Sequence, residues 1–526
     1  MTTTAPATAP AVTVPREFNT AAEYIDRPIG AGHGQRIAYI CGDERVSYAQ
    51  LQRRVNQTAN ALAALGVEME QRVVVLLPNQ PEFVYALFGA MRIGVVAAAM
   101  STAIQPAEQA LLLADSRARA IVVSEALWAP LRSRRAEFPL LKHVFVVGNT
   151  APAPGEHDFA ALVEAASPEC ATAPTTADDV ALWLHTSGST GTPKWAVHLH
   201  RNLPHAEQLY AAPFIGLRPG DVLLAGPCFH AYPLGLATYF ALRAGATVVL
   251  NRERSTPARM FELIAQQQVT VFAGVPTLYA QMLQAAEGRS LALPSVRICL
   301  SAAEPLPAEI HRRWQERFGV EILDGIGTTE ALHVFISNRA GESRPGSSGR
   351  AVPGYDVRLL DEQGNEVADG EIGNLVIRGG SLFAGYWNQI DTSRRVLQGQ
   401  WYHTGDKYLR DADGFYYYSG RADDMLRVSG HWVSPAEVEA ALIAHPAVVE
   451  AAVVGKADAD ELIKPQAFVI LREGVAPSEA LAEELKVHVK ATIAPYNYPR
   501  WIEFVADLPK TATGKIQRFK LRAPAS

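Results

Sequence analysis

Short apolar runs alternate with amphipathic segments along most of the chain. Runs rich in Val, Leu, Ile and Ala are typical of buried strands and occur at residues 72–77, 120–124, 144–147, 180–184, 221–224 and 247–250. Helical spacing of apolar positions lies between them, for example at 81–91, 257–267 and 307–318. This alternation predicts the α/β class, with parallel sheets covered by helices. The alternative is that some short runs are pieces of buried helices.

The pattern becomes strand-rich near residue 350. Residues 357–367 predict a hairpin around Gln363-Gly364-Asn365, and residues 373–378 and 414–420 add short strands bounded by turns. We therefore expect a β-rich subdomain at about 350–422.

Helices and strands alternate again, in miniature, after the segment Gly420-Arg421-Ala422-Asp423-Asp424. They are predicted at 435–444 with Ser434 as N-cap, 448–454, 465–471 and 478–493, which indicates a small α+β domain. The N-terminal residues are rich in Thr, Ala and Pro, a composition typical of disorder. The expected layout is a disordered segment, a large domain and a small domain at residues 1–17, 18–422 and 423–526.

Composition narrows the class of protein without giving its chemistry. A net charge of −6 over 526 residues argues against a nucleic-acid surface. The four cysteines form no CxxC pair, which excludes a disulfide scaffold and fits a reducing cytoplasm. No apolar run approaches the roughly 20 residues of a membrane span, and the N-terminus lacks the pattern of a secretory signal. We expect a cytoplasmic enzyme, a monomer or homodimer, that binds neither nucleic acid nor membrane.

The sharpest motif directly follows the predicted strand at 180–184. Its glycines allow close approach of an anion, and its hydroxyls, backbone N–H groups and lysine suit phosphate oxygens. The residues are Thr186, Ser187, Gly188, Ser189, Thr190, Gly191 and Lys194. The order of a Walker loop is absent. The alternative is a Ser/Gly/Thr surface linker.

Four weaker motifs follow in order. They are Asp324-Gly-Ile-Gly-Thr-Thr-Glu330, Trp401-Tyr-His-Thr-Gly-Asp406, Gly420-Arg421-Ala-Asp423-Asp424 and Pro509-Lys-Thr-Ala-Thr-Gly-Lys515. Small residues in the first allow a flat ring close to the backbone, and Glu330 is a candidate Mg²⁺ ligand. Each motif alone is also compatible with an ordinary turn or a solvated surface loop, so it is their order that carries the inference.

Together these motifs resemble the adenylate-forming superfamily of acyl-CoA synthetases, carrier-protein adenylation domains and luciferases. The resemblance extends from about Phe18 to Arg522, and within the superfamily it is strongest to benzoate-CoA ligases, over the stretches 275–280, 321–339 and 507–522. It implies that ATP adenylates a small aromatic carboxylate, releasing pyrophosphate, and that the thiol of coenzyme A then displaces AMP.

The resemblance also implies roles for individual residues. Lys515 is the catalytic lysine, Thr329 contacts the α-phosphate, and Glu330 ligates Mg²⁺. The loop from Thr186 to Lys194 holds the β- and γ-phosphates. Adenine lies along Asp324, Gly325 and Ile326, and the ribose hydroxyls bind Asp406 with help from Arg421.

The same resemblance implies that the small domain rotates between the two half-reactions, about a hinge at Asp423. Such closure keeps water away from a hydrolysable adenylate. After rotation the pantetheine arm of CoA would pass Ser429, Gly430, His431 and Trp432.

By the same resemblance, three segments form the acid pocket. They supply Phe229, His230, Ala231, Tyr232, Ala302, Ala303, Gly327, His333 and Val334. Their rings suggest a flat slot for a small aryl acid, although each aromatic is also compatible with core packing.

Several residues depart from the benzoate-CoA ligase pattern. His230 replaces a second phenylalanine, and Pro233 replaces glycine. His230 could hydrogen-bond a polar substituent on the ring of the acid, or it could act as an aromatic gate, and both alternatives stay open. Ala303-Glu304-Pro305 replaces a Gly-Glu-Ala type of loop. Trp195 replaces the usual glycine after Lys194, and Arg427 replaces a lysine.

Two further readings stay open. The thiol acceptor is either CoA or the phosphopantetheine of a carrier protein, and a catalytically dead member of the superfamily is disfavoured because Glu330 and Lys515 are both present. His198 and His200 share the alternate spacing of some zinc ligands, but no third ligand is apparent, which favours structural histidines.

Overall fold

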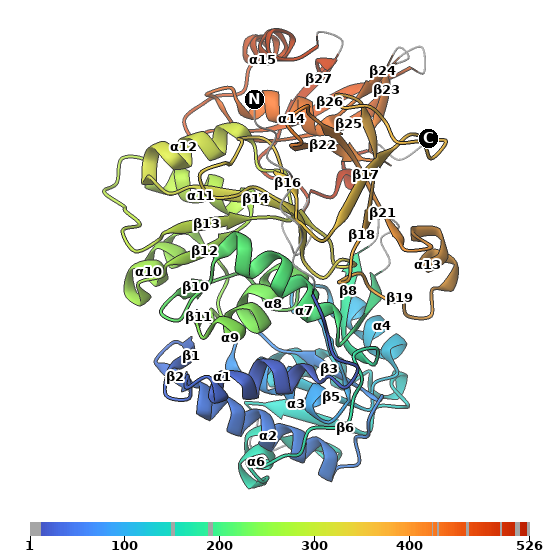
Figure 1. The fold of residues 1–526 in the computed structure, drawn as a ribbon. Coiled ribbons are helices and arrows are strands. Elements are labelled where there is room, and N and C mark those ends of the chain that lie inside the picture. Colours follow the sequence, from blue (N-terminus) through green and yellow to red (C-terminus); the bar gives the residue numbers. More distant parts are fainter. Residues whose placement is uncertain are drawn as a thin grey trace, which may run out of the picture.

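The computed structural model describes residues 12–148, 153–187, 193–422, 424–428, 431–458, 462–494, 497–510 and 516–522. Two large sheets, each with mainly parallel strands, form the core of the large domain (Figure 1). In spatial order the first sheet contains β19 (Gly385–Tyr386), β9 (Pro193–Leu199), β8 (Val180–Ser187), β4 (Val96–Ala99), β3 (Arg72–Leu76), β5 (Ala120–Ser124), β6 (His143–Val147) and β7 (Glu156–Asp158).

The second large sheet has antiparallel strands at both edges and parallel strands between them. Its spatial order is β16 (Arg350–Ala351), β15 (Val334–Ser337), β14 (Ile322–Gly327), β13 (Ile298–Ser301), β12 (Val271–Gly274), β10 (Val222–Leu224), β11 (Thr247–Val249), β1 (Ile37–Cys41) and β2 (Glu44–Ser47).

Helices fill the space between the two sheets and cover their outer faces. They are α1 (Arg27–Gly30), α2 (Tyr48–Ala64), α3 (Pro81–Arg92), α4 (Pro106–Ser116), α5 (Glu125–Arg132), α6 (Phe159–Ala165), α7 (Asn202–Ala206), α8 (Ala231–Gly235), α9 (Ala241–Ala244), α10 (Pro257–Gln267), α11 (Pro276–Ala286) and α12 (Ala308–Phe318), with π-helical turns at Ala22–Asp26, Glu207–Ile215 and Leu236–Phe240 and a 3₁₀ turn at Arg135–Glu137. One apolar core joins both sheets, and each outer face has a core of its own. The expected α/β class is confirmed.

The β-rich part is a five-stranded sheet in the chain between 356 and 421. It contains β17 (Asp356–Leu360), β18 (Ile372–Arg378), β21 (Trp401–Arg410), β20 (Leu397–Gln398) and β22 (Tyr416–Arg421), with α13 (Ile390–Val396) beside it. The hairpin expected at 357–367 forms at its turn, where the Asp361 N–H donates to the Asn365 carbonyl at 2.8 Å and the Val367 N–H donates to the Leu359 carbonyl at 2.9 Å. Its returning arm is short, with a bridge from Leu360 to Glu366, whereas β17 pairs with β18 along its whole length.

The small domain has a separate apolar core. Its strands and helices are β23 (Leu426–Val428), β24 (His431–Val433), α14 (Pro435–Ile443), β25 (Val448–Ala457), β26 (Ile463–Leu471), α15 (Glu479–Thr492), β27 (Trp501–Phe504) and a 3₁₀ turn at Arg518–Lys520. Ser434 N-caps α14 by accepting the Glu437 N–H at 3.1 Å, as predicted. Figure 1 shows this domain, in orange and red, against the end of the large domain that carries α12.

The N-terminal segment is more ordered than its composition suggests. Residues 1–11 lie outside the described chain, but Glu17 bridges Thr176 and the Ala177 N–H donates to the Arg16 carbonyl at 2.8 Å. The expected disorder is therefore wrong for Arg16 and Glu17, whose backbones pair with residues 176–177. Backbone hydrogen bonds do not depend on the side chains, so a composition typical of disorder does not prevent this pairing. Among the described helices, none is both long enough and apolar enough to cross a membrane.

Candidate functional site

The first and last parts of the phosphate motif lie side by side on a β-hairpin. β8 and β9 pair in antiparallel fashion with Thr186 opposite Lys194 and Ser187 opposite Pro193. Between them, Gly188, Ser189, Thr190 and Gly191 lie outside the described residues, as does the side chain of Ser187. The ammonium of Lys194 stands 5.5 Å from the ring centroid of Tyr386 on the neighbouring strand β19.

Trp195 is part of the core beneath this hairpin. Its side chain is fully buried, and its Nε1–H donates to the Leu112 carbonyl of α4 at 3.2 Å. Its ring lies 6.1 Å from that of Trp183 and 5.9 Å from that of His185. The indole in place of the usual glycine therefore fastens β9 to α4 from the outer face of the sheet.

The segment that follows β14 brings Thr329 and Glu330 beside β9. The Thr329 carbonyl accepts a hydrogen bond from Nε2 of His198 at 2.8 Å. Burial lowers the pKa of His198 to about 4, so the ring is neutral and donates through this nitrogen. Glu330 is buried, and its Oε1 accepts the Tyr386 hydroxyl at 2.6 Å. Contacts from two other strands thus fix both predicted residues.

The two histidines of the Val-His-Leu-His segment have ordinary partners. His198 holds the Thr329 carbonyl, while Nδ1 of His200 lies 2.6 Å from the Thr20 hydroxyl. Within the described residues, no group of three or more His, Cys, Asp or Glu side chains is arranged to hold a metal ion. These two contacts connect the stretch from His198 to His200 with the segments that carry Thr329 and Thr20.

The predicted ribose pair is assembled in the five-stranded sheet. Asp406 of β21 and Arg421 of β22 are register partners, and the Arg421 guanidinium donates to Asp406 Oδ1 at 3.0 Å. Arg421 also donates to the Thr404 carbonyl at 2.9 Å. This orients a buried carboxylate at the end of the strand pair.

The predicted adenine residues lie at the carboxyl end of β14. Asp324 is buried, its Oδ1 has no hydrogen-bond partner among the described residues, and burial raises its pKa to about 8. Gly325 admits no side chain, because a Cβ there would lie 2.8 Å from the Ile336 carbonyl oxygen. A buried carboxyl oxygen without a partner can accept a hydrogen bond from a polar group of a ligand.

An aromatic cage surrounds His333 between α8 and β15. Ring centroids of Phe240, Tyr210 and Tyr232 lie 4.5, 5.2 and 5.6 Å from that of His333. Its Nε2 donates to the Tyr232 carbonyl at 3.0 Å, and burial lowers the pKa of the ring to about 3. Tyr210 and Phe240 belong to this cage although sequence reasoning missed them, because both sit in apolar helical stretches without a motif.

The remaining residues predicted for the acid pocket lie on or next to α8, β13, β14 and β15. Phe229 and His230 precede α8 with ring centroids 4.7 Å apart, and Ala231 begins that helix. Gly327 must be glycine, since a Cβ would lie 2.5 Å from the His333 carbonyl oxygen, and Val334 next to it is buried. The other two, Ala302 and Ala303, follow β13, which pairs with β14.

Several residues of the small domain and its hinge that have predicted roles lie outside the described part of the chain. Lys515, Asp423, Ser429 and Gly430 lie outside the described residues. His431 and Trp432 form strand β24 opposite Val428 and Arg427, but the description does not extend to the side chains of His431, Trp432 and Arg427. Their roles stay predictions.

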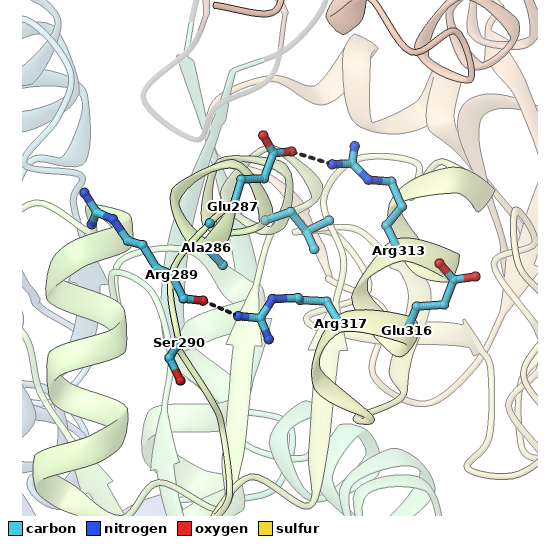
Figure 2. A pocket seen from close by; sticks show the side chains of 9 residues that line it. Ala286, Glu287, Arg289, Ser290, Arg313, Glu316 and Arg317 are labelled. Carbon is cyan, nitrogen blue, oxygen red and sulfur yellow. Dashed lines mark hydrogen bonds and ion pairs between the residues drawn. The ribbon is translucent and has the colours of Figure 1, made fainter.

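An open cleft of about 750 Å³ lies away from these residues, at the ends of α11 and α12. Figure 2 shows the carboxylate of Glu287 facing Arg313, with Arg317 donating to the Arg289 carbonyl. The same Glu287 oxygen lies 3.0 Å from Arg472 of the small domain. This cleft therefore borders the contact between the two domains.

A large layered α/β domain with an added β-sheet, followed by a small α+β domain, is the fold of the adenylate-forming enzymes. A solved structure of the anthranilate CoA ligase AuaEII with anthranoyl-AMP superposes with a TM-score of 0.93, at 39% identity over 97% of each chain. A benzoate CoA ligase from Burkholderia xenovorans LB400 gives 0.88, at 44% identity over 96% of this chain and 100% of that one.

Family models agree with the fold. The model for AMP-binding enzymes matches residues 28–387, and that for the AMP-binding enzyme C-terminal domain matches residues 437–515. The chain belongs to the AMP-binding enzyme family. It is 48% identical to a benzoate–CoA ligase of Thauera aromatica over 98% of both chains. It is 43% identical to a 4-hydroxybenzoate–CoA/benzoate–CoA ligase of Rhodopseudomonas palustris over 96% of this chain and 94% of that one.

Proposed function

We propose that this enzyme joins a small aromatic carboxylic acid, benzoate or a substituted benzoate, to coenzyme A. The carboxylate attacks the α-phosphorus of ATP, the bond to the β-phosphate breaks, and pyrophosphate leaves. The thiol then attacks the acyl carbon of the adenylate, and AMP leaves. One observation carries the proposal. His333, whose ring is surrounded by aromatic side chains, follows the Thr329-Glu330 segment closely in a chain that is nearly half identical to a benzoate–CoA ligase.

Each polar group has a task in bringing two anions together. Positive charge from Lys194, and from Lys515 on the small domain, offsets the converging carboxylate and phosphates. Thr329 contacts the α-phosphate. Asp406, held by Arg421, accepts the ribose hydroxyls. The buried Oδ1 of Asp324 gives the adenine amino group an acceptor.

Glu330 would hold Mg²⁺. A single buried carboxylate fits this cation, which is commonly bound by one or two carboxylates together with substrate phosphates and water. When bound, Mg²⁺ supplies charge neutralisation at the phosphate oxygens.

For the second half-reaction the small domain turns about Asp423 and brings residues 429–432 to the CoA arm. This motion replaces Lys515 at the reacting centre and keeps water from the adenylate. The polar ring of His230, next to the ring of Phe229, favours an acid with a hydroxyl or amino substituent.

Mass spectrometry of the products tests the proposal. The protein is incubated with ATP, Mg²⁺, CoA and an equimolar mixture of benzoate and its hydroxy-, amino- and halo-derivatives. Aryl-CoA together with AMP is the expected result and identifies the acid. Aryl-AMP without aryl-CoA would indicate a carrier-protein acceptor, and ADP would overturn the reaction type. His230→Phe should shift the preference toward benzoate if His230 reads a ring substituent.

A further inference from the structure

The side chain of Tyr386 contacts two groups that the proposed function assigns to ATP. Its hydroxyl donates to Oε1 of Glu330 at 2.6 Å. The face of its ring lies 5.5 Å from the ammonium of Lys194, within the range of a cation–π contact. One residue therefore links the carboxylate proposed for Mg²⁺ with the lysine proposed for the phosphates.

The backbone of Tyr386 is held from two sides. In β19 it pairs with Ala196 of β9, two residues after Lys194. Its N–H donates to the Ser393 hydroxyl of α13 at 2.8 Å. Three residues earlier, the Phe383 N–H donates to the Glu330 carbonyl at 2.8 Å. The phenol is thus presented to Glu330 by a short strand that is anchored to the phosphate hairpin and to the Glu330 backbone.

A buried carboxylate with one oxygen in a short hydrogen bond has a defined orientation. Partners of this kind direct a metal ligand, and their loss commonly reduces metal affinity or activity about 10- to 100-fold. Without the phenol, the Glu330 side chain gains rotamers and must reorder each time a cation binds.

We propose that Tyr386 is a positioning residue that fixes Oε1 of Glu330 so that Oε2 is presented to the Mg²⁺ of MgATP. The inference rests on the proposed function, because it assumes that Glu330 meets the cation. Through the Lys194 contact the same side chain sets the distance between the cation and the phosphate-binding hairpin.

The test measures binding in the absence of turnover. A methylene-bridged, non-hydrolysable ATP analogue is titrated calorimetrically into the full-length protein, once with Mg²⁺ and once in EDTA. The ratio of the two dissociation constants gives the contribution of the cation. Tyr386→Phe keeps the ring over Lys194 and removes only the hydroxyl, so we expect this ratio to fall about tenfold while the EDTA value is unchanged.

Tyr355→Phe is the matched control. The Tyr355 hydroxyl also makes a buried hydrogen bond nearby, at 2.6 Å to Ser381, which in turn donates to the Ala331 carbonyl. Its loss should cost similar stability and leave the Mg²⁺ ratio at the wild-type value. Tyr386→Leu should lower the Mg²⁺ ratio and also weaken binding in EDTA, because the contact with Lys194 is lost.

The titrations distinguish a failure of the role proposed for Tyr386 from a failure of the role proposed for Glu330. A wild-type protein whose affinity does not depend on Mg²⁺ would overturn the role of Glu330 itself. A normal Mg²⁺ ratio in Tyr386→Phe, beside a lost ratio in Glu330→Gln, would overturn only the positioning role. An equal fall in Tyr355→Phe and Tyr386→Phe would show a general packing effect and would also reject it. In Tyr386→Phe/Glu330→Gln the two losses should not add.

Discussion

The two domains are held in place by very different means. In the large domain, Thr329 and Glu330 are fixed by buried hydrogen bonds of 2.6 to 2.8 Å from His198, Phe383 and Tyr386. The small domain meets the large one where α14 packs against β22, and also through an ion pair between Glu287 and Arg472, whose side chains are 53% and 29% exposed. Exposed pairs of this kind contribute only about 0–1 kcal/mol.

This difference between the domains suggests a division of labour: the large domain holds binding groups in fixed positions, and the small domain brings further groups to them. In the proposed function, the large domain presents the groups for phosphates, ribose and acid before any ligand arrives. The small domain has its own core, including the buried pair of Glu439 with Arg518 at 2.7 Å, and can move as a unit. The exposed ion pair adds little to the orientation of this unit, so its removal should shift the balance between orientations without unfolding either domain.

Removing the proposed contribution of the small domain to adenylation should have the largest effect. Lys515→Ala takes away a charge aimed at two converging anions, and loss of one such preorganised group typically costs about 10²–10³ in rate. Pyrophosphate release measures this step, with binding of the ATP analogue largely retained. Lys510→Ala, which removes a lysine paired with Glu450 at 2.7 Å, is the control and should stay near wild type. Equal losses in both variants would contradict the assignment.

On the large-domain side, His198→Phe should lower both stability and adenylation. It leaves the Thr329 carbonyl without its donor, which costs about 1–3 kcal/mol when the acceptor is buried. We expect the adenylation rate to fall about tenfold, since each 1.4 kcal/mol at the transition state is a factor of ten. His200→Phe loses its contact with Thr20 instead, so it should lose stability alone. Chemical denaturation and pyrophosphate release together distinguish the two.

Ala303 offers a smaller effect of opposite sign. Its φ of +79° lies in the left-handed region, which costs a residue with a Cβ roughly 1–2 kcal/mol. Ala303→Gly should therefore raise the free energy of unfolding by about 0.5–1 kcal/mol after the added entropy of the unfolded chain. Ala302→Gly, at a neighbouring buried position without positive φ, should lower it. A destabilised Ala303→Gly protein would show that this strain is absent.

Much of the fold followed from local signals. The helix at 257–267 agrees with α10 at both ends, and the predicted strand at 120–124 is β5, because each has a regular apolar spacing and clear end signals. The turn of the 357–367 hairpin was predicted as well, but the longer pairing of β17 with β18 was not, because pairing between separate segments leaves no local signal in the sequence. Replacement of a family glycine by Ala303 was noticed, but its positive φ needed the structure.

The candidate site shows the same limit. Motifs contiguous in sequence, such as residues 324–330, could be found because their residues follow one another from the end of β14 into the next segment. Tyr386 could not, since its link to Glu330 arises only where β19 joins β9, and a single Gly-Tyr pair has no distinctive spacing. His198 was noticed for its spacing, yet its bond to the Thr329 carbonyl depends on how β9 lies beside the segment after β14.

The smallest expected change tests the contact between the domains. Arg472→Gln removes the ion pair with Glu287, while Arg313→Gln removes the partner of the same carboxylate within the large domain. Both pairs are exposed, so each variant should change the free energy of unfolding by at most about 1 kcal/mol. Stability alone therefore cannot tell them apart, and the two half-reactions must be measured separately.

If the pair helps to hold one orientation of the small domain, Arg472→Gln should move the two half-reactions in opposite directions. A shift of about 1 kcal/mol in the orientation equilibrium changes populations up to about fivefold. One of the two rates, pyrophosphate release or thioester formation from preformed aryl-AMP, should fall while the other rises. Arg313→Gln leaves Glu287 paired with Arg472 and should keep their ratio at the wild-type value. Parallel loss of both rates in Arg472→Gln would mean that the pair supports the site in general, because only an effect on domain orientation can favour one step at the expense of the other.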